Sequence, residues 1–445
     1  MVYKLNFNHK AMKIKNVWFS LVVALGLVSC ESALDVYPFQ SLEASQAIKN
    51  ENDLQYAING CYDAFQFAGY YNRSLVVLSE LASDNAYNGG TIIEYGQLNN
   101  HVILEDNGVT SGIWSAIYTG INRVNTALYY LDRLDDIPQD RKTVYEAELR
   151  FMRALHYYNL AVLFSDVPIR TKPTMSLDDL HVPLSPQAEV LNDVVLTDLL
   201  FALGKLGGNN PRRATNAGVS ALLARLYQFT GEYQEAVFYA TEVIENSGRI
   251  LESDYASLFT PEVSVESIFE IDFTPQDGNR MAQYLFPSSM AGRYEVAPEE
   301  NLLEAFDPDD VRKTASFELD DPNPYCIKYN DITYGSDNVY VFRLAEMYLI
   351  RAEALARSNG NRSDIRSDIN TIRSRASLDP VTADNYDELL LIIEQERRLE
   401  FAFEGHRWFD LVRTNRAVDL LDPVTSTDQH YYPIPLSESN TNEAI

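Results

Sequence analysis

The stretch that decides the fold lies near the end of the chain, where residues 393–411 read IEQERRLEFAFEGHRWFDL. Upstream of it, Asn385 and Glu388 have the spacing of a capping box, which marks the start of a helix. Gly405 supplies a residue that enters the left-handed conformation and stops that helix. Trp408 then restarts an apolar face at helical spacing. The stretch therefore predicts a helix, a sharp turn and a second helix.

Glu396 falls on the apolar face of the first predicted helix, seven residues after Leu389 and seven before Phe403. An unpaired buried charge costs far more than a helix can recover, so this carboxylate must be protonated or lie against a cation. The arginines next to it in the sequence are the expected partners. We therefore predict a charge network that pins the two helices together.

Residues 396–411, which read ERRLEFAFEGHRWFDL, resemble the C-terminal signature of the SusD/RagB family of nutrient-binding outer-membrane lipoproteins. Residues 147–155 with the Asp-Val-Pro at 166–168 are also similar to the family. The resemblance implies that the signature locks a helical scaffold and carries no chemistry. An alternative takes Glu404 and Asp410 as the acid and base of a glycosidase, but 64 carboxylates offer many such pairs.

The first segment is predicted to lie outside the fold. Two lysines precede apolar residues 17–28, which as a helix would span about 18 Å against a hydrocarbon core of roughly 30 Å. Residues 1–29 are therefore predicted to be a signal peptide, with Met12 as an alternative start. Leu27-Val28-Ser29-Cys30 resembles the bacterial lipobox, so we predict lipidation of Cys30 and a lipid anchor in the outer membrane. Glu31 resembles the signal that sends such lipoproteins to the cell surface.

The composition is strongly acidic, with 36 Lys and Arg against 64 Asp and Glu and a net charge of −28. The predicted leader holds four lysines and no acid, so the mature chain would carry −32. Such a surface repels phosphate backbones and anionic head groups, which argues against a nucleic-acid partner. No Gly/Ser-rich or Pro-rich linker divides the mature chain. Residues 30–445 are therefore predicted to be a single domain, with halves at about 30–215 and 216–445.

Cys61 and Cys326 are the other two cysteines of the mature chain. One pair in so long a chain is no disulfide framework, and we favour two buried thiols, although an exported protein could also pair them. Six histidines lack ligand spacing, and the sequence has no zinc helix, no phosphate-binding glycine loop and no serine nucleophile elbow. We therefore predict no cofactor, no metal and no enzymatic activity.

Helical periodicity dominates the rest of the chain. Residues 114–134 and 144–164 predict a helical hairpin. The pairs at 217–247 and 342–376 resemble tetratricopeptide units, in which alanines let two antiparallel helices approach closely. Such pairs cannot bury their faces alone, so several must stack. The predicted fold class is mostly α, a tetratricopeptide-like helical-repeat superhelix with long irregular loop insertions and a few short strands, the clearest at 267–273.

Two polar regions rich in tyrosine, residues 85–107 and 250–338, are the predicted binding loops. Sugar rings stack on aromatic side chains, while Asp, Asn and Arg read their hydroxyl groups. Trp114 and Trp408 both lie in scaffold motifs, so a stacking platform must consist of tyrosine or phenylalanine. By loop position and residue type, the candidate glycan-binding residues are Asp84, Asn85, Tyr87, Tyr95, Asn99, Tyr284, Arg293 and Tyr294.

The resemblance also implies a function. Members of the family bind an oligosaccharide at the cell surface and deliver it to a SusC-like TonB-dependent outer-membrane transporter, over which they sit as a lid. Two alternatives are a glycoside hydrolase and a helical-repeat scaffold that binds a peptide or another protein. The sequence does not identify the glycan.

Overall fold

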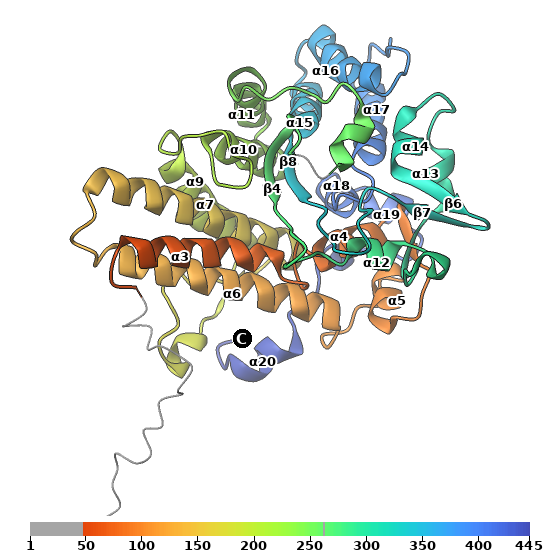
Figure 1. Cartoon of the computed structure of the whole chain (residues 1–445). Coiled ribbons are helices and arrows are strands. Elements are labelled where there is room, and N and C mark those ends of the chain that lie inside the picture. The colour runs from red at the N-terminus through yellow and green to blue at the C-terminus, as the bar shows by residue number, and fades with distance from the viewer. Residues whose placement is uncertain (1–47, 261–262) are drawn as a thin grey trace, which may run out of the picture. The chain divides into compact units, whose positions relative to one another are not determined.

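The computed structural model describes residues 48–260 and 263–445 (Figure 1). The predicted signal peptide at 1–29 and the predicted lipidation site Cys30 lie outside the described residues. Residues 50–445 form one unit, and the description that follows concerns it. In the part of the chain that is described, no helix combines the length and the apolar character that a bilayer crossing requires.

Three long helices build the N-terminal half: α3 (Glu51–Asp63), α6 (Gly108–Leu131) and α7 (Gln139–Phe164). The last two form the predicted hairpin, and α3 packs against both of them (Figure 1). Asn107 fixes the start of α6, because its side-chain oxygen accepts hydrogen bonds from the backbone N–H groups of Val109 and Thr110. The start of α6 matters for function, because the chain just before it forms part of the candidate site.

The segment after α7 returns across that helix and then packs along it. Strand β2 (Val167–Pro168) pairs antiparallel with β3 (Leu184–Ser185). The short helix α8 (Gln187–Glu189), the π-helical segment η4 (Val190–Leu196) and α9 (Thr197–Ala202) then form one continuous helical stretch. Asp198 is buried there and pairs with Arg153 of α7 at 2.7 Å.

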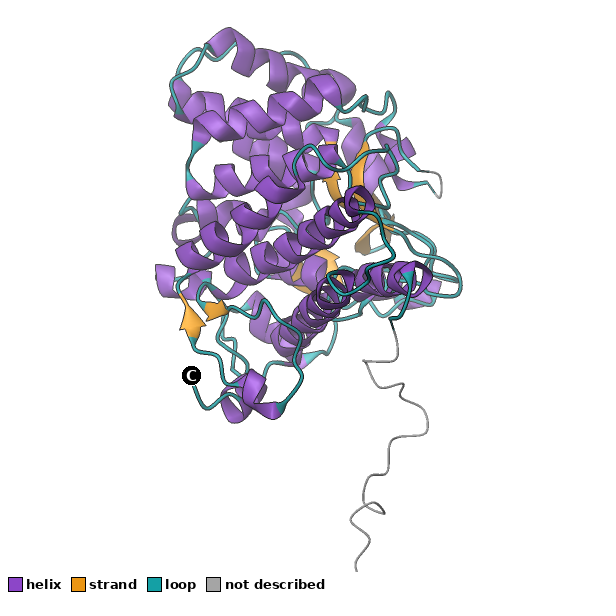
Figure 2. Ribbon diagram, turned by 90° about the vertical axis from the view of Figure 1, so that its left-hand side faces the viewer, coloured by secondary structure: helices purple, strands orange, loops and turns teal. Residues whose placement is uncertain are grey.

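The C-terminal half is a stack of antiparallel helices, which confirms the predicted repeat architecture (Figure 2). Its members are α10 (Asn216–Thr230), α11 (Tyr233–Asn246), α15 (Leu344–Arg357), α16 (Arg362–Arg375) and α17 (Tyr386–Glu400). Ala221, Ala224 and Ala240 have no exposed surface, so the helices approach closely where these small side chains lie. Gly231 ends α10 in the left-handed conformation with φ of 83°.

The long insertion between α11 and α15 was predicted to be irregular apart from one strand, and this prediction was wrong in part. Strand β4 (Ser267–Ile271) lies where it was predicted and pairs antiparallel with β8 (Val339–Arg343). The other elements are too short for periodicity to reveal them. They are η5 (Tyr255–Phe259), α12 (Met281–Leu285), η6 (Ser288–Met290), β5 (Val296–Pro298), α13 (Glu300–Glu304), α14 (Val311–Ser316), β6 (Phe317–Asp320) and β7 (Asn323–Cys326).

Short elements complete the fold. They are η2 (Ala64–Gln66), α4 (Ser74–Leu81), β1 (Ala86–Asn88), α5 (Ile93–Asn99), η3 (Leu177–Leu180), α18 (Arg407–Arg413), α19 (Ala417–Leu420), η7 (Thr427–His430) and α20 (Leu436–Thr441). Cys61 and Cys326 are both buried free thiols, as predicted. Burial raises the pKa of each thiol to about 12, so neither is a reactive thiolate at neutral pH.

The decisive stretch folds as a helix, a turn and a second helix, as predicted. Asn385 caps α17 by accepting a hydrogen bond from the backbone N–H of Glu388 at 2.8 Å. The helix ends at Glu400, before Gly405, and both Phe403 and Gly405 have positive φ in the turn that leads to α18. The backbone N–H of Gly405 donates to the buried carboxylate of Glu80 at 2.9 Å, which ties the turn to α4.

Glu396 is buried and ion-paired, but its predicted partners were wrong. Its carboxylate contacts Arg312 at 2.9 Å and Arg373 at 2.5 Å, and both arginines are distant in sequence. The adjacent arginines point elsewhere, because successive residues of an α-helix lie about 100° apart around its axis. Arg397 contacts Asp410 at 2.8 Å, and Arg398 donates to Asn301 at 2.5 Å.

The buried network is balanced in charge. Glu400 has no exposed surface and contacts Arg343 at 2.5 Å, Arg312 at 3.4 Å and also Arg375. Arg343 in turn contacts Glu404 at 2.8 Å. The connected bases are Arg312, Lys328, Arg343, Arg373 and Arg375, and the connected acids are Asp310, Glu266, Glu396, Glu400 and Glu404. Equal numbers of buried charges of each sign avoid the penalty of an uncompensated ion.

The pKa values of the buried acids follow from this pairing. Burial opposes the ionisation of Asp410, but Arg397 and Arg413 outweigh it and lower its pKa to about 2. Burial likewise opposes the ionisation of Glu353, and Arg413 and Arg357 lower its pKa to about 2. Glu80 behaves differently, because burial without a bonded cation raises its pKa to about 7.

The substitution Glu400→Gln should lower the free energy of unfolding by about 3–5 kcal/mol, because it leaves three buried arginines short of one negative charge. Urea unfolding followed by circular dichroism measures this loss. The matched control is Asp384→Asn, since Asp384 pairs with Arg366 at the surface with 67% of its side chain exposed, and its unfolding midpoint should change little. Equal losses in the two variants would show that the network does not stabilise the fold.

The stability should also fall steeply in acid. The folded-state pKa values of Asp410 and Glu353 lie below the ordinary carboxyl range, so their stabilising effect is present above about pH 4.5 and is lost as the pH falls toward 2. Glu80 has the opposite effect. Because its folded-state pKa is raised, its contribution to the stability of the fold increases as the pH falls from about 7 to 4.5. Thermal midpoints measured from pH 7 to pH 2.5 should therefore drop mainly below pH 4.5. The drop in thermal midpoint below pH 4.5 should become shallower in Asp410→Asn. A thermal midpoint of the unaltered protein that does not change with pH would contradict the lowered pKa values of these buried acids.

Candidate ligand-binding face

The two tyrosine-rich regions meet at a two-stranded sheet. Strand β1, from the segment before α6, pairs antiparallel with β5, from the long insertion, so that Tyr87 lies opposite Ala297 and Asn88 opposite Val296. Helices α5 and α12 flank this sheet, and Figure 1 shows them close to each other. We call this surface the β1–β5 face, and it includes the side chains of the loops that border the two strands.

Tyr284 lies at the centre of the face. The guanidinium carbon of Arg73 is 4.2 Å from the centroid of the Tyr284 ring, and that of Arg293 is 4.7 Å away. Arg293 also donates to the Tyr284 hydroxyl at 3.2 Å. The ring of Tyr95 lies 6.1 Å from the ring of Tyr284, between centroids. Two cations therefore meet one aromatic ring, which is an arrangement that cation–π attraction favours.

Tyr87, Arg293 and Tyr294 are the candidate residues that present an aromatic ring or a cation at least partly to the surface. Arg293 is exposed and the two tyrosines are half-buried. The Tyr294 hydroxyl donates to the backbone oxygen of Pro324 in β7 at 2.9 Å. Burial, and then the contact with the Tyr87 hydroxyl, raise the pKa of Tyr294, so its hydroxyl stays protonated at neutral pH. Two neutral aromatic rings and one cation are thus presented together.

The other candidates lie deeper. Tyr95 is 2% exposed and Tyr284 is 8% exposed, so they form the floor of the face. Asn85 is fully buried, where its amide donates to Glu80 at 2.8 Å and its oxygen accepts from Arg398 at 3.1 Å. Neither ring can offer a full stacking surface, and Asn85 has no surface for a ligand in this conformation.

The polar groups of Asp84 and Asn99 are also bonded within the protein. The Asp84 carboxylate contacts Arg407 at 2.7 Å, and although burial opposes its ionisation, the bonded guanidinium of Arg407 lowers its pKa. The Asn99 oxygen accepts from the backbone N–H of Asn88 at 3.2 Å and its amide donates to the backbone oxygen of Leu81 at 3.4 Å. The predicted residues are therefore brought together, with the tyrosines and Arg293 on the face and the Asp and Asn residues beneath it.

Sequence reasoning missed Arg73 and Glu295. Arg73 follows Tyr70-Tyr71-Asn72 directly before α4, and such a polar turn with aromatic neighbours is the same signal that marked the other loops. Glu295 lies next to the candidate Tyr294, and its carboxylate holds Arg293 at 3.0 Å. No sequence pattern indicates that pairing, since it depends on the local backbone.

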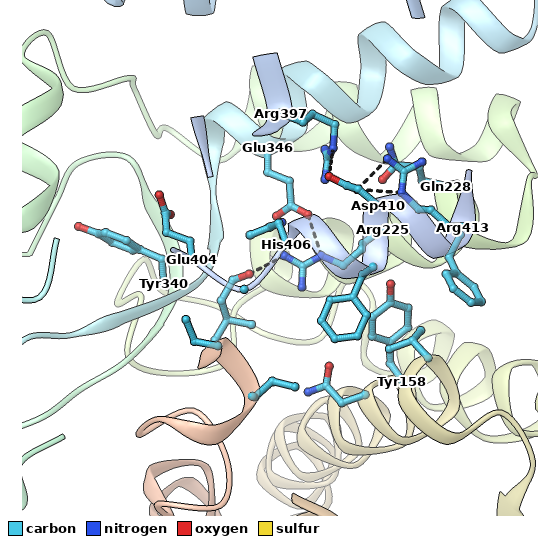
Figure 3. Close-up of a pocket in the computed structure, with 18 of the residues that line it drawn as sticks. Tyr158, Arg225, Gln228, Tyr340, Glu346, Arg397, Glu404, His406, Asp410 and Arg413 are labelled. Atoms are coloured by element: carbon cyan, nitrogen blue, oxygen red, sulfur yellow. Dashed lines mark hydrogen bonds and ion pairs between the residues drawn. The ribbon is translucent and has the colours of Figure 1, made fainter. Parts of the chain in front are cut away.

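A separate cavity of about 60 Å³ lies inside the helical scaffold (Figure 3). Figure 3 shows Arg225, Glu346, His406 and Asp410 around it, and Arg225 pairs with Glu346 at 2.6 Å. Burial and the nearby Arg225 lower the pKa of His406 well below its usual range, so the ring is neutral. Ligand pockets measure roughly 300–1,000 Å³, so this cavity can hold only a few waters.

Glu404 and Asp410, the acid and base of the hydrolase alternative, also line this cavity. Burial opposes their ionisation, but Arg343 and Lys328 lower the pKa of Glu404, and Arg397 and Arg413 lower that of Asp410. A glycosidase needs one carboxyl whose pKa is raised so that it can donate a proton. This pair therefore lacks a proton donor at neutral pH, and no sugar ring fits between its members.

Two shallow grooves of about 300 and 290 Å³ lie elsewhere. The first is lined by Glu353, Arg357, Leu391 and other residues of α15, α17 and α18. The second lies along α6 and is lined by Tyr118, Arg170 and polar side chains. The first groove has no aromatic residue in its lining and the second has only Tyr118, so neither resembles a sugar-stacking platform as closely as the β1–β5 face does. Among residues 48–260 and 263–445, no cluster of His, Cys, Asp and Glu has the geometry of a metal site.

The chain is similar to known proteins in sequence and in fold. Residues 34–228 match the family described as "Starch-binding associating with outer membrane", and residues 325–445 match the family described as "SusD family". "SusD-like protein P2" of Formosa agariphila is 28% identical over 91% of this chain and 91% of its own length. "Starch-binding protein SusD" of Bacteroides thetaiotaomicron is 40% identical over 25% of this chain and 21% of its own length.

Solved structures share the fold at low identity. The structure described as "Laminarin binding SusD-like protein" superposes with a TM-score of 0.80 at 24% identity, over 89% of this chain and 98% of that one. "Surface glycan-binding protein A from Bacteroides fluxus" gives a TM-score of 0.79 at 22% identity, over 89% and 98%. The two family matches at either end of the chain, the relatives along its length and the shared fold show that this protein belongs to the SusD/RagB family.

Proposed function

We propose that this protein is a cell-surface lipoprotein that binds an oligosaccharide on the β1–β5 face and delivers it, without cutting it, to a SusC-like TonB-dependent outer-membrane transporter. The observation that carries this proposal is the gathering of Tyr87, Tyr294 and Arg293 on one surface, from loops about 200 residues apart in the chain. Aromatic faces beside a cation and polar groups suit a sugar, whose ring stacks and whose hydroxyl groups accept hydrogen bonds.

The candidate residues have different roles in this proposal. Tyr87, Arg293 and Tyr294 contact the ligand, because their side chains are at least partly exposed, whereas the equally half-buried Asp84 and Asn99 have their polar groups bonded to the protein. Tyr95 and Tyr284 form the floor beneath it. Asp84, Asn85 and Asn99 hold β1 in place through the bonds described above and do not touch the ligand.

The relatives support a carbohydrate ligand. Their names describe starch binding, laminarin binding and surface glycan binding, and one matched family is described as associating with the outer membrane. The lipid at Cys30 and the transporter partner follow from the lipobox and the family resemblance, and they remain predictions. A lipid anchor would hold the chain at the membrane even though the acidic surface repels anionic head groups.

The loop at residues 89–92 is held in one conformation by Glu295. Its carboxylate accepts hydrogen bonds from the backbone N–H groups of Thr91 at 3.0 Å and Ile92 at 3.3 Å. A Cβ atom at Gly90 would lie 2.0 Å from this carboxylate, so a larger residue there would displace Glu295 from the loop. The loop borders Tyr87, and its rigidity reduces the ordering cost of binding.

Glycan binding without turnover is the first expected result. Isothermal titration of the purified mature protein against a panel of oligosaccharides should find at least one ligand, and chromatography should find no shortened product. Tyr294→Ala should weaken the Kd about tenfold, or about 1.4 kcal/mol, through the loss of a stacking surface. The matched control is Tyr56→Ala, since Tyr56 lies on α3 and is 74% exposed. This variant should bind the same glycan with unchanged affinity. Cleavage of any glycan would overturn the proposal, as would an unchanged affinity in Tyr294→Ala.

The role of Glu295 can be measured without a ligand. In Glu295→Ala the backbone N–H groups of Thr91 and Ile92 lose their charged acceptor, worth about 1.5–3 kcal/mol, so their hydrogen exchange should accelerate about tenfold or more. Hydrogen exchange followed by mass spectrometry or NMR reads this directly. The exposed Glu300 provides the control, because Glu300→Ala should leave the exchange of these amides unchanged.

A further inference from the structure

Arg73 is a cation without a counter-ion. The structure describes all 26 arginines of the sequence, and among the described residues only Arg73, Arg249 and Arg280 have no carboxylate within 4.0 Å. The guanidinium of Arg73 makes no hydrogen bond to any described residue, and its Nε is buried without a partner. Its contact with the protein is the Tyr284 ring, 4.2 Å from the guanidinium carbon. In a chain of net charge −28, an arginine without a carboxylate is unusual.

Two of these three arginines border the β1–β5 face. The backbone N–H of Arg280 donates to the side chain of Asn72 at 3.1 Å, so Arg280 lies beside the residue that precedes Arg73. Its backbone oxygen accepts from the N–H of Tyr284 at 3.3 Å, one helical turn on. The Arg280 side chain is exposed and makes no hydrogen bond or ion pair within the described residues. Unpaired positive charge therefore collects around Tyr284.

The nearby carboxylate cannot neutralise this charge. One oxygen of Glu295 accepts from Arg293 at 3.0 Å, and the other accepts from the N–H groups of Thr91 and Ile92. Its side chain is 5% exposed, so its hydrogen-bonding capacity is largely used. Glu295 is therefore engaged by Arg293 and the loop, and it leaves the guanidinium of Arg73 without a carboxylate partner among the described residues.

A guanidinium group with free N–H donors binds oxyanions with two parallel hydrogen bonds. Carboxylate and sulfate groups are the oxyanions that oligosaccharides carry. The acidic charge of the whole chain does not forbid such a ligand, since charges more than about 8 Å away are largely screened at physiological ionic strength. The guanidinium carbon of Arg73 lies 4.2 Å from the Tyr284 ring, well within that distance of a group bound beside this ring.

We propose that the β1–β5 face selects anionic oligosaccharides, with Arg73 binding a carboxylate or sulfate group of the sugar beside the Tyr284 ring. This inference rests on the proposed function and narrows its ligand class. Arg73 sets the preference for charge, and the tyrosines at the surface bind the sugar ring. Binding of the anionic ligand should weaken as salt is added, because a charge pair at a half-exposed site is screened.

The first test uses the unaltered mature protein and matched pairs of sugars. Isothermal titration compares trigalacturonate with its methyl ester, and a sulfated galactan oligosaccharide with its desulfated form. We expect one charged member to bind at least tenfold more tightly than its neutral partner, and the pair that shows the difference tells whether carboxylate or sulfate is recognised. Equal affinity within both pairs would overturn the inference.

The second test assigns the preference to Arg73. In Arg73→Gln the advantage of the charged sugar over its neutral partner should fall below about threefold, while the neutral sugar binds as before. The control is Arg133→Gln, because Arg133 also lies over a tyrosine ring, 3.4 Å from the centroid of Tyr129, but is at the far end of α6. Thermal unfolding checks that both variants fold, and the comparison of sugar pairs needs no variant.

The outcomes separate this inference from the proposed function. Tight binding of neutral glycans with no advantage for their charged counterparts would retain the proposed function and overturn the preference for charge. A protein that binds no glycan of either kind would overturn both. A charge preference that survives Arg73→Gln would overturn the assignment to Arg73.

Discussion

The buried contact between Glu400 and the arginines 312, 343 and 375 is the constraint on which the rest of the structure depends. These arginines come from α14, β8 and α16, so one carboxylate of α17 joins three elements that are distant in sequence. Removing such charges from water is costly, and the cost is offset only when every partner is in place. Moving any one of these elements would leave a buried charge without its partner, which is strongly unfavourable.

The same stretch of sequence also positions the β1–β5 face. Arg398 and Arg407, on either side of the turn, reach Asp84 at 3.3 and 2.7 Å, and the N–H of Gly405 binds Glu80 in α4. These contacts join residues more than 300 positions apart, directly before strand β1. The motif thus holds in place the segment that leads into β1, where the candidate Tyr87 lies. This is a physical reason for the signature stretch to consist of alternating charges and large apolar side chains.

Sequence reasoning recovered what periodicity and capping determine. The helices, the hairpin, the stacked pairs and the turn at Gly405 follow from local patterns of apolar residues, glycine and caps. It failed on Glu396, because the identity of a buried ion-pair partner depends on which elements meet. It also could not recognise three-residue strands such as β1 and β5, nor foresee that Asn85 and Tyr95 are buried while Tyr87 is half-exposed. Loop position predicted the neighbourhood of the candidate site and residue type did not predict exposure.

The division between a fixed scaffold and a variable face explains how chains of this fold can differ widely in sequence. Asp84, Asn85, Asn99 and Glu295 have their polar groups engaged within the protein, so the face is formed before a ligand arrives and little ordering accompanies binding. Exchanging an exposed tyrosine or an unpaired arginine leaves the buried network intact, since neither takes part in it. Structures at 22–24% identity superpose with TM-scores near 0.8, so this fold tolerates wide changes in sequence.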